Sequence, residues 1–273
     1  MFLIEVIALI LIAFGSGIIS AIIGVGGGFL VVPILILVFG LSSHQAVGTS
    51  LVMIVFTALS STFAYARQRR IDYKAGLVLT LGTVPGAIAG AYITKFITAK
   101  GLASLFGAFL IIIAIRMIIE GRKEEISKDP VARTRGWPRK LVDSKGVPFE
   151  YTANIMFGVA LSFLGGFASG FFGVGGGAVM VPVMALGVGI PIHVAVATSM
   201  FIMIFTSISG AAIHLTLRHV LLDYAAWLII GIIGGTQLGA AIARKLEARS
   251  LKRVFGICLV VIGLRMALEY VLS

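Results

Sequence analysis

Two glycine clusters are the residues of this chain most able to bind a ligand inside a membrane. Residues 24–28 read Gly-Val-Gly-Gly-Gly, and residues 173–177 repeat the same five residues. Each glycine costs about 1 kcal/mol relative to alanine in a helix, so both clusters are expected to interrupt helices. The freed N–H groups, followed by a new helix N-terminus, favour a small anion. The candidate binding glycines are therefore Gly24, Gly26, Gly27, Gly28, Gly173, Gly175, Gly176 and Gly177.

Polar side chains follow each cluster at matching positions. Thr49-Ser50 and Thr198-Ser199 open the next apolar stretch of each half, and they either contact a ligand or bond to the backbone of their own helix. His44 and His193 come just before them. A capping or interfacial position and a proton-linked role are both open for these histidines, because imidazole titrates near neutrality.

A third polar position breaks the match between the halves. Thr236-Gln237 stands within an apolar stretch of the second half, where the first half has Ala87-Ile88. Gln237 is a candidate for setting selectivity or direction, and an interhelical hydrogen bond is the alternative.

The glycine clusters belong to a repeat that covers the chain. The offset between equivalent residues is 149, and it relates Pro33 to Pro182 as well as His44 to His193. It also relates two glycine series with a spacing of four, which predict close helix packing. These series are Gly82, Gly86 and Gly90, and Gly231, Gly235 and Gly239.

Composition places the chain in a membrane. Of its 273 residues, 59% are hydrophobic and 12% are charged, and mean hydropathy is +1.10. A soluble domain contains about a quarter charged residues. The net charge is +11, and the basic residues that produce it stand between the apolar stretches. This is the usual place of charges that set membrane topology, so no nucleic-acid partner is predicted. The single cysteine, Cys258, stands in an apolar run and is expected to be a small core residue.

The apolar stretches predict a polytopic all-α membrane protein made of two repeats with about five helical segments each. Residues 2–39 would form a helix of roughly 57 Å, nearly twice the ~30 Å hydrocarbon core. The glycine cluster is therefore expected to divide this stretch into a long arm and a short arm, with Pro33 bending the second. Ordinary spans are expected near 45–66, 74–95 and 101–120, a second broken pair near 153–187, and spans near 194–215, 224–243 and 251–271.

Basic loops set the expected orientation. The 67–74 connection has four Lys or Arg residues, the 121–150 stretch eight, and the 244–253 connection five. All three lie in the cytoplasm only if each broken pair crosses the membrane an even number of times. The halves are then inverted, and both termini face outward. The expected division is a first repeat over 1–120, a cytoplasmic basic linker over 121–152 and a second repeat over 153–273.

Several functions are disfavoured by missing residues. Apart from Glu5 near the start, no Asp or Glu stands in the middle of a predicted span, although carboxylates are the usual partners of cations and protons in membranes. The glycine runs have no following Gly-Lys-Ser/Thr, which excludes an ATPase phosphate loop. No metal-ligand spacing or nucleophile–base set is visible, so no metal, cofactor or enzymatic activity is expected.

The paired motifs are similar to those of a known family. Gly24–Pro33 with His44–Ser50, and Gly173–Pro182 with His193–Ser199, resemble the TauE/SafE sulfite exporters, also called toluene-sulfonate uptake permeases. The resemblance implies transport of sulfite, sulfonates or related sulfur-containing anions across the cytoplasmic membrane. The interpretation is a secondary transporter for a small anion that works by alternating access. A passive anion channel and a non-transporting membrane scaffold are the alternatives. The substrate, direction, coupling ion and oligomeric state, a homo-oligomer included, stay open.

Overall fold

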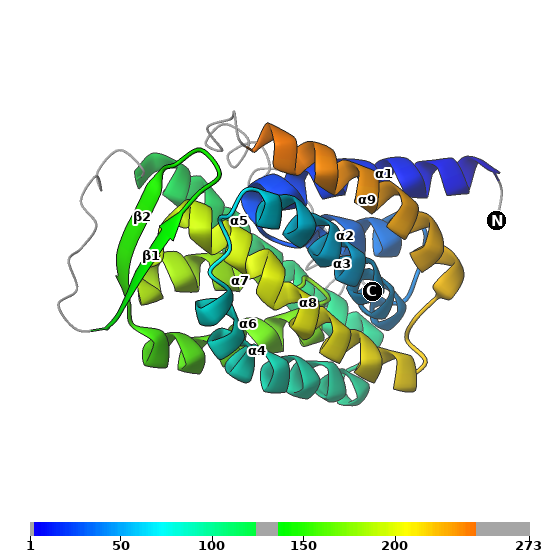
Figure 1. Cartoon of the computed structure of the whole chain (residues 1–273). Coiled ribbons are helices and arrows are strands. Elements are labelled where there is room, and N and C mark those ends of the chain that lie inside the picture. The colour runs from blue at the N-terminus through cyan, green and yellow to red at the C-terminus, as the bar shows by residue number, and fades with distance from the viewer. Residues whose placement is uncertain (1–2, 124–135, 244–273) are drawn as a thin grey trace.

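The computed structural model describes residues 3–123 and 136–243, and its helices form one bundle (Figure 1). The predicted last span, 251–271, lies outside the described residues. The first half contains α1 (Leu3–Ile23), α2 (Gly28–Leu37), α3 (Ser43–Arg67), α4 (Tyr73–Ile93), a 3₁₀ turn (Thr94–Phe96) and α5 (Ala99–Lys123). Next come β1 (Trp137–Val142), β2 (Pro148–Ala153), α6 (Ile155–Phe172), α7 (Gly177–Pro182), a π-helical turn (Val183–Val188), α8 (Ile192–Thr216) and α9 (Leu222–Ile242).

Six of the described helices are long and apolar enough to cross a membrane. The predicted all-α, multi-pass membrane fold is thereby confirmed. The predicted division of each broken stretch is confirmed as well, since α1 is followed by a helix of 10 residues and α6 by one of 6 residues that continues as a π turn. Pro33 lies inside α2. Pro182 ends α7 where the π turn begins, as expected of a proline that disturbs a helix.

The two halves exchange helices. α1 packs against α9, and α6 packs against α4, so the first helix of each half lies beside the fourth helix of the other (Figure 1). The glycine series make these contacts close. A methyl group added to Gly86 would lie 2.2 Å from the carbonyl oxygen of Phe163, and one added to Gly235 would lie 2.0 Å from that of Phe14. The predicted packing role of both series is confirmed.

The predicted linker contains an antiparallel hairpin that sequence reasoning missed. β1 and β2 pair from Trp137↔Ala153 to Val142↔Pro148, at one end of the bundle (Figure 1). Inward and outward side chains alternate along β1, and Asp143 closes the turn by accepting hydrogen bonds from the N–H groups of Lys145 and Val147. The inward side chains join an apolar cluster with α7 and α8, so this part of the linker is a folded cover.

The hairpin is fastened to the α3–α4 connection through Asp72, the buried N-cap of α4. The Asp72 carboxylate accepts hydrogen bonds from the Arg139 guanidinium at 2.8 and 2.5 Å and from the Tyr151 hydroxyl at 2.6 Å. Burial raises the pKa of Asp72, but the hydrogen bonds from Arg139 and Tyr151 outweigh burial and hold this pKa below its usual range. Arg70 forms a second ion pair, with Asp143, at 3.1 Å.

Candidate functional site

The glycine clusters form two buried breaks with the same backbone shape. The first break (residues 24–27) joins α1 to α2, and the second break (residues 173–176) joins α6 to α7. Gly26 and Gly175 have φ values of 99° and 83°, and the other matching glycines of the two breaks also have a positive φ. Side chains rarely adopt this region, so the sequence requires glycine there. These positions are Gly24 with Gly173, Gly26 with Gly175, and Gly27 with Gly176.

The two breaks meet each other reciprocally. A methyl group added to Gly28 would lie 2.0 Å from the carbonyl oxygen of Gly173, and one added to Gly177 would lie 2.1 Å from that of Gly24. The main chains of the two halves therefore touch where both helices are interrupted. Every residue of both breaks is buried, which makes this crossing an interior site for exposed backbone groups.

The predicted serines hold the crossing together in this structure. The Ser50 hydroxyl bonds the carbonyl oxygens of Val47 and Gly173 at 2.8 and 2.9 Å. The Ser199 hydroxyl bonds those of Val196 and Gly24 at 2.8 and 3.2 Å. Each serine thus joins its own helix to the break of the opposite half. Their contact with an anion stays a prediction, and it would require these bonds to open.

The predicted threonines also bond across the halves. Thr49 Oγ1 accepts a hydrogen bond from the N–H of Leu221 at 3.0 Å, and Thr198 Oγ1 accepts one from the N–H of Asp72 at 3.0 Å. Leu221 and Asp72 are themselves repeat equivalents, each preceding the first residue of α9 or α4. Both threonines are fully buried. They form equivalent hydrogen bonds between the two halves at opposite ends of the bundle.

Two apolar side chains fill the crossing. A methyl group added to Gly26 or Gly175 would lie 2.6 or 2.7 Å from the sulfur of Met203. Ile54, the repeat equivalent of Met203, stands against Gly28 and Gly175. Both side chains are buried, and the flexible thioether of methionine can adapt to a neighbour that moves. Sequence reasoning missed this pair because neither residue type signals a site.

The two breaks differ in how their N–H groups and hydroxyls are used. At the first break, Gly26 donates its N–H to Ser20 Oγ at 2.9 Å, and Ser16 Oγ donates to the Gly27 carbonyl at 2.9 Å. At the second break, the equivalent of Ser16 is Gly165. Ser169, the equivalent of Ser20, is fully buried, and its hydroxyl has no hydrogen-bond partner among the described residues. The second break therefore has an unused buried hydroxyl beside it.

The remaining predicted residues lie away from the crossing. His44 Nε2 bonds the carbonyl oxygens of Thr94 and Ile97 at 3.0 and 3.1 Å, and its ring lies 4.8 Å from that of His219. His193 lies in the first turn of α8, at the other end of the bundle. Gln237 donates to the backbone and hydroxyl oxygens of Ser60 at 2.8 and 2.9 Å, which is the interhelical alternative.

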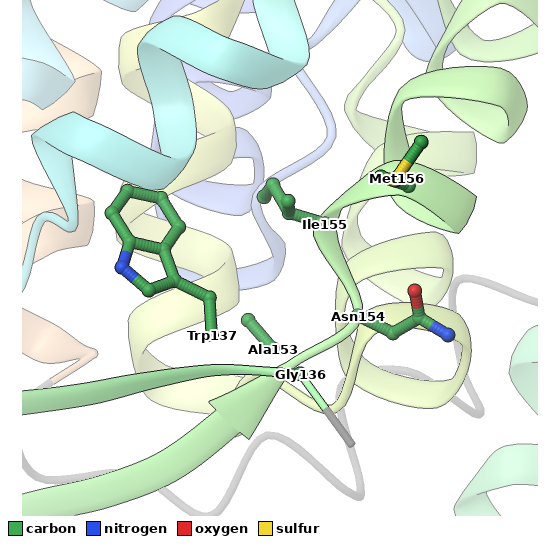
Figure 2. Close-up of a pocket in the computed structure, with 6 residues that line it drawn as sticks. All are labelled: Gly136, Trp137, Ala153, Asn154, Ile155 and Met156. Carbon is green, nitrogen blue, oxygen red and sulfur yellow. The ribbon is translucent and has the colours of Figure 1, made fainter.

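A surface pocket at the base of the hairpin has no part in this crossing. Figure 2 shows Trp137 from β1 beside Ile155 from the start of α6, with the Asn154 amide turned to the other side. Its lining residues include no charged side chain. The glycine crossing is the candidate site.

Comparison with known proteins identifies the family of this chain. The family model for the sulfite exporter TauE/SafE matches residues 9–266. The chain belongs to the TauE/SafE family. It is 36% identical to the probable membrane transporter protein YunE of Bacillus subtilis, with 98% of this chain and 99% of that protein covered. It is 33% identical to the probable membrane transporter protein MJ0441 of Methanocaldococcus jannaschii, with 98% and 97% covered. No solved structure matches the chain.

The family match includes both glycine breaks. The matched residues contain both breaks, the helices that follow them and the hairpin between the halves. The resemblance inferred from the two motifs is thus confirmed, and the chain is a multi-pass membrane transporter by family.

Proposed function

We propose that this chain is a secondary transporter that carries a small anion, namely sulfite, an organosulfonate or a related sulfur oxyanion, through the crossing of the two breaks. The observation that carries the proposal is the reciprocal, fully buried contact of Gly24 with Gly177 and of Gly28 with Gly173. Interrupted helices that meet inside a bundle are the usual place where membrane carriers bind solutes.

The chemistry of the crossing favours a negative ligand. The N–H groups of Gly28 and Phe29, at the start of α2, have no carbonyl to bond within their own helix, whereas the N–H of Leu30 donates to the Gly27 carbonyl at 3.1 Å. The helix N-terminus adds partial positive charge. In the six candidate spans, the acidic residues are Glu5 and Asp223, both in first turns. A cation at the crossing would thus meet hydrogen-bond donors without a carboxylate, whereas an oxyanion matches them.

Ser169 is the side chain that we assign to the ligand in addition to the predicted residues. Its buried hydroxyl lies beside the second break, since a methyl group on Gly176 would be 3.3 Å from Ser169 Cβ. A buried hydroxyl without a partner is costly, and a bound oxyanion would accept its hydrogen. The ligand therefore binds closer to the second break than to the first.

A carrier fits the crossing better than a channel. Ile54 and Met203 fill the space between the breaks, so passage of an anion needs a change of conformation. The halves are inverted in this proposal. In support, Thr49 near the start of α3 contacts Leu221 beyond the end of α8, while Thr198 near the start of α8 contacts Asp72 beyond the end of α3. The two helices therefore run antiparallel.

The proposal extends to the position of the chain in the cell. With the basic hairpin segment in the cytoplasm, both termini face outward, and the membrane is the cytoplasmic one. The hairpin then covers the inner end of the bundle, and the α8–α9 connection lies at the outer end.

Transport by purified protein in liposomes tests the function. Sulfite, sulfate, thiosulfate, sulfoacetate and taurine should be compared for saturable uptake and for counterflow, which a carrier shows and a channel does not. Gly26→Leu should abolish uptake, because the added side chain meets Met203 and the left-handed backbone disfavours leucine. Gly15→Ala is the matched control, since a methyl group there meets nothing within 4 Å. Wild-type uptake by Gly26→Leu, or tight binding of a cation but of no anion, would contradict the proposal.

A further inference from the structure

Three imidazoles gather at the end of the bundle away from the hairpin. His214 lies in the last turn of α8, His219 lies in the α8–α9 connection, and His44 lies in the first turn of α3. His214 Nδ1 is 3.1 Å from His219 Nδ1, and the ring centroids of His44 and His219 are 4.8 Å apart. Of these three histidines, the sequence pointed only to His44, because His214 and His219 become its neighbours only when the two halves pack together.

The carbonyl contacts fix the direction of the hydrogen bonds. His214 Nε2 is 3.0 Å from the carbonyl oxygen of Gly170, so it carries a hydrogen, and neutral His214 must accept at Nδ1. His219 therefore donates from Nδ1 to His214. One added proton on the pair keeps this bond. Two added protons would set two N–H groups and two positive charges against each other at 3.1 Å. The geometry thus suits the binding of a single proton.

The first half has a contact equivalent to that of His214 with Gly170, but it has no pair of histidines. Tyr65 is the equivalent of His214, and its hydroxyl donates to the carbonyl oxygen of Ala21 at 2.5 Å. Ala21 is in turn the equivalent of Gly170. In both halves, a side chain near the end of α3 or α8 therefore bonds the last turn before the break. Only the second half uses an imidazole for this bond, which can accept a proton at its second nitrogen.

His214 is connected to the proposed anion site through the last turn of α6, where it bonds the Gly170 carbonyl. Gly170 follows Ser169 in the sequence and precedes the second break by three residues, about 4.5 Å along a helix axis. A positive charge on His214 would strengthen its bond to Gly170 and would act on an anion at this break through a medium of low dielectric. An anion that enters the membrane interior alone is costly, and a proton bound beside it offsets that cost.

The other ionisable groups in the described part of this end are carboxylic acids, phenols, lysines and an arginine, whose ordinary pKa values lie outside the range from pH 5 to 8. Burial, and then the charge of His44, lowers the pKa of His219, so its protonation is expected below the ordinary histidine value of about 6.5. α6 contributes no ionisable side chain over its length. The other ionisable residues on the elements at this end are Glu5, Tyr92, Lys95, Lys100, Arg218, Asp223 and Tyr224.

We propose that the His214–His219 pair binds the proton that crosses the membrane together with the anion, which makes the chain a proton–anion symporter. This inference rests on the proposed function. It assigns a coupling site to residues that lie outside the glycine crossing and that touch it through the last turn of α6.

Proteoliposomes with a trapped pH-sensitive dye test the coupling. Sulfate and thiosulfate serve as probes because they stay fully ionised across the pH range, whereas sulfite titrates. Wild-type uptake of the transported probe should acidify the lumen and should accelerate as the outer pH falls. His214→Tyr copies the contact of Tyr65 with its carbonyl, so it should still bind the probe while lumen acidification and pH dependence are lost. His219→Gln keeps a donor toward His214 and should show the same loss.

The outcomes separate this inference from the function. Wild-type uptake of sulfate or thiosulfate without proton movement would overturn the coupling and leave the transporter intact. Failure of every anion in the panel to be transported would overturn both. His193→Gln is the decisive comparison, because His193 lies at the other end of α8. If His193→Gln loses proton uptake while His214→Tyr retains it, the proton binds at His193 and not at the His214–His219 pair. If His214→Tyr does not fold, His219→Gln decides alone.

Discussion

Alanine at two equivalent serines should have opposite effects on stability and on ligand binding. Ser20 and Ser169 occupy the same position before the first and the second break. Ser20 Oγ accepts the N–H of Gly26 at 2.9 Å, whereas Ser169 Oγ has no partner among the described residues. The two substitutions remove the same atom from matching buried places, so each is the control for the other.

The expected magnitudes follow from these contacts. Ser20→Ala leaves the buried Gly26 N–H without an acceptor, which should reduce the free energy of unfolding by about 1–3 kcal/mol. Ser169→Ala breaks no bond within the protein, so stability should be unchanged or slightly improved. If the Ser169 hydroxyl donates to the anion, its loss should cost about 1.5–3 kcal/mol of binding, or roughly a ten- to hundred-fold rise in Kd.

Two measurements on the same detergent-purified samples separate these effects. Thermal or denaturant unfolding without ligand reports the internal bond, and titration calorimetry with the transported anion reports binding. Ser20→Ala should lower the unfolding midpoint and leave Kd close to the wild-type value once the protein is folded. Ser169→Ala should raise Kd and leave the midpoint unchanged.

Either of two results would refute the reasoning. Equal losses of binding in Ser20→Ala and Ser169→Ala would place the anion midway between the halves. Wild-type binding by Ser169→Ala, with the midpoint unchanged, would show that its buried hydroxyl contacts no ligand.

Three further predictions concern the fold. Gly28→Ala should destabilise the protein by about 1–3 kcal/mol, because its methyl group would overlap a carbonyl of the second break. Gly15→Ala should leave stability unchanged, because its methyl group would meet open space. Equal melting temperatures of the two variants would refute the close contact of the breaks. The carboxylate of Asp72, whose pKa is lowered, stabilises the fold above its unfolded pKa of about 3.9 and less as pH falls through the folded value. Asp72→Asn should therefore lower the melting temperature at pH 7 far more than at pH 3. A Ser144→Cys substitution on a Cys258→Ala background should react with an impermeant maleimide only from the cytoplasmic side, and labelling of intact cells would reverse the topology.

Local patterns carried most of the fold prediction. Apolar length located the spans, glycine clusters located the breaks, and a spacing of four glycines located the packed faces, because each of these signals depends on neighbouring residues alone. The hairpin was missed, since its two strands of 6 residues stand in a basic segment whose charge suggested a loop. The alternation along Trp137–Val142 and the Ser-Lys-Gly turn at 144–146 were the available signals.

The site was predicted in part. The glycines were placed correctly at the breaks, but the partners of Ser50 and Ser199 lie 123 and 175 residues away, and no local pattern gives such a contact. The offset of 149 could have drawn attention to His214, since it stands where the first half has Tyr65. An ionisable residue that replaces its repeat equivalent is a signal that needs no structure.

The two ends of the bundle are closed by the same bond in unlike surroundings. Thr198 holds the N–H of Asp72 at the hairpin end, and Thr49 holds the N–H of Leu221 at the histidine end. If these bonds alone closed the ends, the two would open with similar ease. At the hairpin end, Arg139 adds an ion pair to Asp72 that stays charged near neutral pH.

The histidine end offers no such fixed pair at the matching place, because the equivalent of Asp72 is Leu221. It has instead the contact of His214 Nδ1 with His219 Nδ1 at 3.1 Å, between two imidazoles that can each bind a proton. If the proposed orientation holds, a proton that arrives from outside meets the His214–His219 contact, whereas the inner end has the ion pair of Arg139 with Asp72. In the proposed proton–anion symporter, this difference between the ends would let the proton gradient act at one end only, as alternating access with a coupled proton requires.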